Sequence, residues 1–435
     1  MERTEFMMTD PNTISVAKNL DDNDTLKKFR ERFYFPLLNG KEVIYFTGNS
    51  LGLQPKSTQE HVLRELEDWA TFGVEGHFHA RTPWYYYKDF LKSSIARLLG
   101  AKEAEVVVMN SLTVNLHLLL VSFYRPTKNR YKIICEYDSF PSDLYALQSQ
   151  ASYHGYNPDD VIIYLAPREN EYALRTEDIL KAIADAGDTL AIVMFGAVNY
   201  YTGQYFELDQ ITEATHRVGA TCGFNLAHAA GNVLMKLHEW QVDFACFCSY
   251  KYLNSGPGGV SGIFVHEHHL GKKLPQFAGW WGNDPATRFQ IPRTFVPVNT
   301  AAAWALSNDP VLSMAALKAS LEIFDEAGIE NLRKKSELLT GYLEKIIEQV
   351  NADIGIPESK IRIITPKEAD RRGCQLSLMF SKNGKEIFSR LTGLGVITDW
   401  REPDVIRIAP VPLYNSFEDV YKLGVQLKEI MSNSV

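Results

Sequence analysis

The sequence predicts an α/β protein with two parts: a large domain built on a mostly parallel sheet and a smaller C-terminal α+β domain. Two observations support this prediction. Seven short apolar runs alternate with segments of helical length between residues 100 and 270. These runs are almost continuously apolar, which is typical of parallel strands that helices cover on both faces. With 435 residues, the chain is also long enough for more than one domain.

The expected elements follow in chain order. Residues 1–40 are polar and expected to be helical in part. A helix is expected over 57–72, because Val62, Leu66 and Trp69 recur at helical spacing after Ser57, a suitable N-cap. The expected strands are 105–109, 131–135, 161–165, 191–195, 221–224, 242–248 and 262–266. Later helices are expected at 316–324, 332–350 and 387–394. We therefore expect an N-terminal segment (1–50) that packs with the small domain, a large domain (51–310) and a small domain (311–435).

The composition excludes several classes of protein. A net charge of -8 argues against a general nucleic-acid binder, which would need clustered Lys and Arg. No window of 18 residues is both apolar and uncharged, and the N-terminus carries acids rather than an apolar signal region, so we expect no membrane segment. The five cysteines are an odd number and lie mostly in apolar runs, as reduced core cysteines do. We expect a soluble cytoplasmic protein that acts on a small molecule.

No metal site is expected from these patterns. Cys246 and Cys248 would share one face of a strand, where core packing is the simpler explanation. His77 and His79 have a spacing that would suit a metal on a strand, but no nearby acid or cysteine completes a ligand set.

Polar side chains follow four of the expected strands. In a parallel sheet, ligands bind at the carboxyl ends of the strands, so these side chains should converge on one site. The segments are 110–113, 140–143 and 225–228, together with Lys251. Four such segments converging by accident would be improbable.

Lys251 is the strongest candidate for chemistry, because it follows the apolar run 242–248 and precedes a glycine cluster at 256–259. A desolvated lysine has a lowered pKa and can condense with an aldehyde. Glycines let the backbone approach a flat cofactor and its phosphate. This order is typical of a pyridoxal phosphate site, although an ordinary surface lysine at the end of a strand would give the same pattern.

Five further residues have a role if pyridoxal phosphate binds, and an alternative if it does not. Leu112 and Thr113 could begin a helix whose N–H groups hold the phosphate, or belong to an ordinary cap. Phe140 could stack on the ring or lie in the core. Asp143 could face the ring nitrogen or satisfy a turn. His228 could donate to the cofactor, position a neighbour or be purely structural.

Arg407 lies within an apolar strand of the small domain. A buried guanidinium needs a partner. This partner could be a substrate carboxylate or an internal Asp or Glu. Loops with no periodic pattern surround Trp280 and cover 304–310.

Together these motifs resemble the kynureninase family. The matching segments are GNSLGLQP (48–55), LTVNLH (112–117), FPSD (140–143), LAHA (226–229), CSYKYLN (248–254) and RIAPVPLYNS (407–416). Their order and spacing make the match specific, and it runs from about residue 40 to the C-terminus. The resemblance implies a fold-type-I pyridoxal phosphate enzyme and a homodimer with active sites at the subunit interface. It also implies hydrolysis of L-kynurenine or 3-hydroxykynurenine to L-alanine and an anthranilate, in tryptophan catabolism and NAD biosynthesis.

The resemblance also implies roles for individual residues. Lys251 would carry the Schiff base and move the Cα proton, and Tyr250 would bind the phosphate and act as acid or base. The cofactor would be held by Leu112, Thr113, Phe140, Ser142, Asp143, Asn225, His228, Tyr250, Lys251, Trp280 and Asn308. The substrate would be bound by Ser50, His77, Trp280, Asn308 and Arg407, where Trp280 and Asn308 could come from the partner subunit. His77 and Asn308 favour the hydroxylated substrate.

Two positions depart from the family pattern. Asn225 stands where the family has an Asp that pairs with the ring nitrogen, and an amide does not favour a pyridinium as a carboxylate does. Gly196 stands where relatives can carry a hydroxyl residue. Asn225 predicts weakened catalysis with cofactor binding largely kept, and Gly196 predicts the loss of one hydrogen bond to the cofactor. Asn225 leaves open a cofactor-binding but catalytically silent homologue, and a separate alternative is another enzyme of the same fold, such as a cysteine desulfurase or an aminotransferase.

Overall fold

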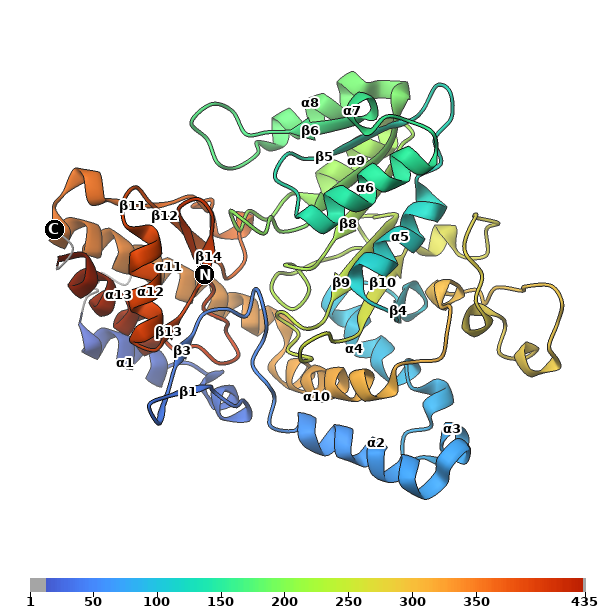
Figure 1. Cartoon of the computed structure of the whole chain (residues 1–435), viewed down its shortest axis with the longest axis horizontal. Helices are drawn as coiled ribbons and strands as arrows, with labels where there is room; N and C mark the ends of the chain where they lie inside the picture. Colours follow the sequence, from blue (N-terminus) through green and yellow to red (C-terminus); the bar gives the residue numbers. More distant parts are fainter. Residues whose placement is uncertain (1–12, 433–435) are drawn as a thin grey trace, which may run out of the picture.

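Two main β-sheets organise the chain in the computed structural model, which describes residues 13–432 (Figure 1). Within that range the larger sheet has seven strands in the order β4-β10-β9-β8-β7-β5-β6. Their bounds are β4 Val106–Val108, β5 Lys132–Glu136, β6 Ile162–Leu165, β7 Leu190–Gly196, β8 Thr221–Asn225, β9 Phe244–Cys248 and β10 Ser261–Val265. Neighbours among β5 to β9 are parallel, and β10 is antiparallel to β4 and β9. The predicted mostly parallel sheet and its strands are confirmed.

Helices cover both faces of this sheet, which explains why its strands are almost continuously apolar. The helices α5 (Leu112–Phe123) and α6 (Pro141–Tyr153) share one buried core with Val107. The opposite core contains Val106 and Val108 with residues of α4 (Asp89–Leu99), α8 (Thr176–Ala186), α9 (Leu208–Arg217) and α10 (Val311–Ala327). The five cysteines are free and buried.

The smaller sheet is antiparallel and has the order β11-β12-β15-β14. Its strands are β11 Ile361–Ile363, β12 Leu376–Phe380, β14 Asp399–Arg401 and β15 Val405–Ile408. It shares a core with α11 (Ile329–Ile354), α12 (Gly384–Gly393) and α13 (Phe417–Ser432). The N-terminal segment joins this part of the molecule, because α1 (Ile14–Asp22) contacts α13 and β3 (Ile44–Tyr45) pairs with β13 (Val396–Ile397). The expected domain boundaries stay a prediction, and residues 1–12 lie outside the described residues.

The predicted helices are present, with longer bounds for those in the second half of the chain. The helix expected at 57–72 is α2 (Thr58–Phe72). Ser57 stands directly before it but does not cap it, so that detail was wrong. The backbone of Ser57 is already helical and its side chain bonds no N–H of the first turn, whereas a capping residue is normally extended. Short elements complete the fold: β1 Leu37–Leu38, β2 Lys41–Glu42, α3 Gly76–His79 and α7 Pro158–Val161. None of the described helices has the length and apolar character of a membrane-spanning segment.

Candidate active site

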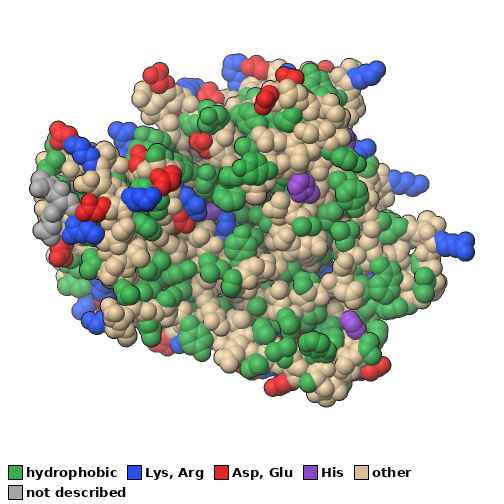
Figure 2. Space-filling model, viewed as in Figure 1, with side chains coloured by type: hydrophobic (Ala, Val, Ile, Leu, Met, Phe, Trp, Pro, Cys, Tyr) green, Lys and Arg blue, Asp and Glu red, His purple; other side chains and the backbone are tan. Residues whose placement is uncertain are grey.

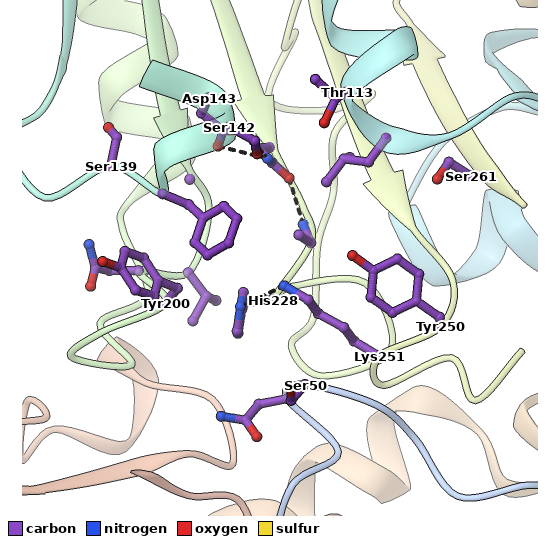
Figure 3. A pocket seen from close by; sticks show the side chains of 18 of the residues that line it. Ser50, Thr113, Ser139, Ser142, Asp143, Tyr200, His228, Tyr250, Lys251 and Ser261 are labelled. Carbon is purple, nitrogen blue, oxygen red and sulfur yellow. Dashed lines mark hydrogen bonds between the residues drawn. The ribbon is translucent and has the colours of Figure 1, made fainter. Parts of the chain in front are cut away.

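A pocket lies where the carboxyl ends of β5, β7, β8 and β9 face the smaller sheet (Figure 3). Its volume of about 440 Å³ is in the usual range for a small-molecule site. It brings together these residues expected from the sequence: Ser50, Leu112, Thr113, Phe140, Ser142, Asp143, Asn225, His228, Tyr250, Lys251 and Arg407. The parallel strands explain this convergence, because their carboxyl ends meet at one edge of the sheet.

Lys251 stands on a loop that packs closely against the N-terminal segment. The N–H of Gly52 donates to the carbonyl of Tyr250 at 2.9 Å. A Cβ at Gly52 would lie 2.3 Å from the carbonyl oxygen of Lys251 and 2.2 Å from Asn254 Oδ1. Only glycine allows this approach. Gly52, in the segment 48–55, therefore holds the loop that carries the lysine.

The amine of Lys251 points into the pocket and meets an imidazole. Its Nζ lies 2.9 Å from His228 Nε2. Burial lowers the pKa of both groups, and the charge of Arg407 lowers the pKa of each further. A neutral His228 accepts a hydrogen bond from the amine at Nε2, which makes its other nitrogen the donor. That Nδ1 is buried and has no partner in the described part of the chain, so it can donate to a ligand.

Asp143 and Asn225 form a buried pair in the lining of the pocket, and Asp143 is labelled in Figure 3. The amide of Asn225 donates to both carboxylate oxygens of Asp143, at 2.9 and 2.7 Å. The N–H of Ala227 donates to Asn225 Oδ1, which sets the orientation of the amide. Burial raises the pKa of Asp143 to about 6. A buried carboxylate in this position can pair with a protonated ring nitrogen.

The N-terminus of α5 opens into the same pocket. Ser111 holds the N-cap position but its side chain bonds no N–H of the first turn, so these donors are available to a ligand. Leu112 and Thr113 line the pocket beside Ser261, whose buried hydroxyl has no partner among the described residues. Unpaired donors at a helix N-terminus suit a phosphate.

Phe140 lies at the pocket rather than in the core. Its side chain is 42% exposed, and its ring centroid lies 5.8 Å from Lys251 Nζ. The ring also meets Tyr200 edge to face at 5.2 Å. A flat ligand beside Lys251 would therefore find an aromatic face.

Two arginines from the smaller sheet share one carboxylate at the mouth of the pocket. Arg407 donates to Asp399 and to the carbonyl of Tyr200, both at 2.6 Å. Arg401 also pairs with Asp399, at 3.1 Å. Asp399 is thus the internal acid that the sequence analysis considered as one possible partner of Arg407. Two cations against one anion still leave a net positive charge, and Arg407 Nε is buried without a hydrogen-bond partner among residues 13–432. This arrangement can bind the carboxylate of a small molecule.

Sequence reasoning missed Glu136, which ends β5 and lines the pocket. The N–H of Gly196 donates to its carboxylate at 3.0 Å, and the hydroxyl of Ser139 lies 3.3 Å away. Burial raises the pKa of Glu136 to about 7. Its place at the end of a strand was a usable signal. Asn49 lies in the segment 48–55 but was not singled out, and other lining residues gave no signal of their own: Asp138, Ser139, Val198, Asn199, Tyr200 and Arg401.

Three expected residues do not line this pocket. His77 lies in α3 with its ring edge-on to Trp84 at 5.5 Å. Trp280 is half exposed and donates to the carbonyl of Arg288. Asn308 is exposed in the segment before α10. Within a single chain these side chains are held away from Lys251, because α3 and the segments around 280 and 308 lie beyond the large sheet (Figure 1).

Comparisons with known proteins identify relatives over nearly the whole chain. A model of the kynureninase C-terminal domain matches residues 332–427. The chain is 54% identical to a kynureninase of Flavobacterium psychrophilum, with 96% of this chain and 98% of that protein covered. It is 46% identical to a kynureninase of Mus musculus, with 98% and 95% covered.

Solved structures share the fold at low identity. A cysteine desulfurase from Thermococcus onnurineus NA1 has a TM-score of 0.76 at 17% identity, with 94% of this chain and 98% of that chain covered. A C-DES variant with glycine covalently linked to its pyridoxal phosphate cofactor has a TM-score of 0.75 at 16% identity, with 89% and 96% covered. The predicted pyridoxal phosphate fold of type I is thereby confirmed.

The buried carboxyl of Glu136 predicts a pH-dependent stability of the ligand-free protein. Its pKa is about 7 in the folded state and near 4.5 when unfolded, so between these values the folded state alone keeps the proton. Stability from this group therefore falls as pH rises from about 5 to 7, by roughly 3 kcal/mol in total. Glu136→Gln removes the titration and keeps an acceptor for Gly196. We expect the variant to gain up to about 3 kcal/mol over the parent at pH 8 and little at pH 4.5.

Urea denaturation at both pH values measures this difference. Glu213→Gln, at an exposed position of α9, is the matched control and should change nothing. An equal change in stability at both pH values would show that Glu136 does not titrate in this range.

Proposed function

Because the chain belongs to the kynureninase family, we propose that the pocket around Lys251 is where it hydrolyses kynurenine. The reaction is pyridoxal phosphate-dependent cleavage of kynurenine, and pyridoxal phosphate is the cofactor. The weakening expected from Asn225, and the alternative of a silent homologue, are not borne out by these relatives. The observation that carries the proposed site is the buried Lys251 amine at 2.9 Å from a neutral His228.

The side chains of the pocket fit this cofactor. The uncapped N-terminus of α5 and the hydroxyl of Ser261 would hold its phosphate. Phe140 would face the ring and Asp143 the ring nitrogen, while the unpaired Nδ1 of His228 offers a further donor. When bound, pyridoxal phosphate supplies an aldehyde for the substrate amine and an electron sink for breaking the Cβ–Cγ bond.

The residues of the chain then have separate tasks. Burial lowers the pKa of Lys251, which favours the neutral amine that takes and returns a proton at the substrate Cα. Burial raises the pKa of Tyr250, so its hydroxyl stays protonated and can donate a proton near the substrate carbonyl. Arg407 and Arg401 orient the substrate through its carboxylate. Ser50 lies across the pocket from Asp143 (Figure 3). The proposed preference is for the hydroxylated substrate, 3-hydroxykynurenine.

We also propose that two copies of the chain form a dimer whose partner completes the aryl part of the site. His77, Trp280 and Asn308 lie outside the pocket of their own chain, although the family resemblance gives them substrate contacts. Large apolar side chains are exposed just before α3 and in the segment around 290, including Val74 at 75% and Ile291 at 82%, and the two segments meet where the ring of Phe78 lies 6.4 Å from that of Phe289. Figure 2 shows hydrophobic side chains on the face in view where α2, α3 and the segment around 290 lie.

Cytoplasmic location and a place in tryptophan catabolism and NAD biosynthesis are further parts of the proposed function.

Release of anthranilate and alanine from L-kynurenine, with pyridoxal phosphate added, tests the proposed site. We expect turnover by the parent protein and none by Lys251→Ala. The Asn225→Asp variant should change kcat by less than about tenfold, since one pKa unit of support at the ring nitrogen corresponds to a factor of ten and Asp143 would still face that nitrogen. Turnover only in Asn225→Asp would show that Asp143 is insufficient, and full turnover by Lys251→Ala would refute the site.

Arg407→Gln tests the carboxylate contact. Loss of a charge-assisted hydrogen bond of about 3 kcal/mol should raise KM for kynurenine roughly 100-fold. The visible absorbance of bound cofactor should stay unchanged, because Arg407 is not proposed to hold it. Arg362→Gln, an exposed arginine of the same sheet, is the matched control. An unchanged KM in Arg407→Gln would assign this arginine to Asp399 alone.

A paired substitution of Val74→Asp and Ile291→Asp tests the dimer. Ile291 has φ of 51°, which aspartate tolerates better than a β-branched residue, so the fold should not suffer. Sedimentation equilibrium should shift from twice the chain mass toward one chain mass, with loss of turnover. Leu394→Asp, at an exposed position of the small domain, is the control. A variant that stays dimeric would place the interface elsewhere.

A further inference from the structure

A second group of possible metal ligands lies at the end of strands β9 and β10 that is farther from Lys251. Asp243 directly precedes β9, and the short helix Glu267–His269 follows β10. Because β9 and β10 are antiparallel, the start of one meets the end of the other. Lys251 follows the far end of β9, so this group is separated from the active site by the length of the strand.

Three ligand atoms converge in this group. Asp243 Oδ1 lies 3.2 Å from His268 Nε2 and 2.7 Å from His269 Nε2, and the two imidazole nitrogens lie 2.8 Å apart. In a tetrahedral zinc site with bonds of about 2.1 Å, neighbouring ligand atoms are about 3.4 Å apart. The observed triangle is slightly smaller. Movements of a few tenths of an ångström would admit an ion above it.

The other carboxylate oxygen of Asp243 is already fixed by the protein. His216 Nε2 lies 2.8 Å from Oδ2, and the N–H of Cys222 donates to the same oxygen at 2.7 Å. These partners orient the carboxylate and leave Oδ1 for the two histidines. Such outer contacts are typical of carboxylates that bind metals.

Packing also holds both imidazoles in place. The ring of His269 meets Phe123 edge to face at 5.0 Å, and Phe123 stacks on Phe244. The ring of His268 lies 4.2 Å from that of His266. The side chain of Asp243 is buried at 6% exposure, whereas that of His268 is 37% exposed. The group is therefore ordered and still open to solvent on one side.

A neighbouring group, Glu105 with His238 and His266, lacks this arrangement. The carboxylate of Glu105 accepts backbone N–H bonds from Lys102 and Glu267, and His266 Nδ1 accepts one from His268. These atoms are used in local backbone structure. Within residues 13–432, the group at Asp243 is thus the better candidate.

We propose that Asp243 Oδ1, His268 Nε2 and His269 Nε2 bind a divalent transition-metal ion of the zinc class, with water as the fourth ligand. Two imidazoles and one carboxylate suit such ions. The ion ties the start of β9 to the end of β10 and stabilises the sheet without taking part in kynurenine hydrolysis. The expectation of no metal site rested on the cysteines and on His77, and the HEHH segment at 266–269 comes together with Asp243 only in the fold.

Metal titration of the chelator-treated holoenzyme, freed of excess cofactor, tests this proposal. Calorimetry with Zn²⁺ should show one saturable site per chain. His269→Gln should weaken binding about 100-fold or more, and His216→Gln, which removes an orienting contact, by about 10- to 100-fold. His79→Gln, an exposed histidine outside the group, should bind as the parent does. Kynurenine turnover should stay unchanged in all three variants.

Visible absorption of bound Co²⁺ gives a second readout, which is measured on the parent holoenzyme. The parent holoenzyme should develop the intense visible absorption of four-coordinate Co²⁺, which Zn²⁺ then displaces. Absence of a saturable site, weak octahedral absorption only, or equal affinity in parent and His269→Gln would each overturn the proposal. The histidines would then be hydrogen-bond donors to Asp243 alone.

Discussion

Burial of a primary amine beside a neutral imidazole is the constraint on which the rest of the site depends. Lys251 must lose its proton at a working pH, and desolvation lowers its pKa toward that condition. His228 can accept from the amine because its own pKa is held well below the usual range. Arg407 lowers the pKa of both groups, while Asp143 opposes it at the lysine. Burial and the charge of Arg407 therefore both shift the Lys251 amine toward its uncharged form, against the opposing charge of Asp143.

The topology of the sheet explains how residues far apart in sequence meet around this amine. Glu136, Gly196 and Asn225 end three parallel strands, so they reach the same edge. Lys251 follows a fourth strand, and Gly52 lets the N-terminal segment close against its loop. The arginines arrive from the smaller sheet, which faces this edge across the pocket. A site built in this way depends on both parts of the chain being packed together.

The sequence was sufficient for the features that depend on local pattern. Continuous apolar runs predicted every strand of the large sheet, and the ends of those strands pointed to Lys251 and Asp143. Features that depend on register and tertiary contact were less accessible. Nothing in the sequence pairs Arg401 with Asp399, and Glu136 was one acid among many. Ser57 had the residue type of a cap but the wrong backbone conformation. His77 and Trp280 lie outside the pocket of their own chain; the family resemblance allowed for this at Trp280, but the residue pattern by itself did not indicate it at His77.

Asn225 is best understood through its contact with Asp143. An aspartate at this position would place a second carboxylate within hydrogen-bond distance of the first, and two such groups cannot both ionise without a cation between them. The amide instead donates to both oxygens of Asp143 and is itself held by the N–H of Ala227. It therefore keeps Asp143 ordered and supports its charge before any ring nitrogen is present. Unlike an aspartate, the amide carries no negative charge that could pair with a protonated ring nitrogen. The same substitution that looks like a loss from the sequence is, in the folded chain, a fixed donor for the carboxylate that remains.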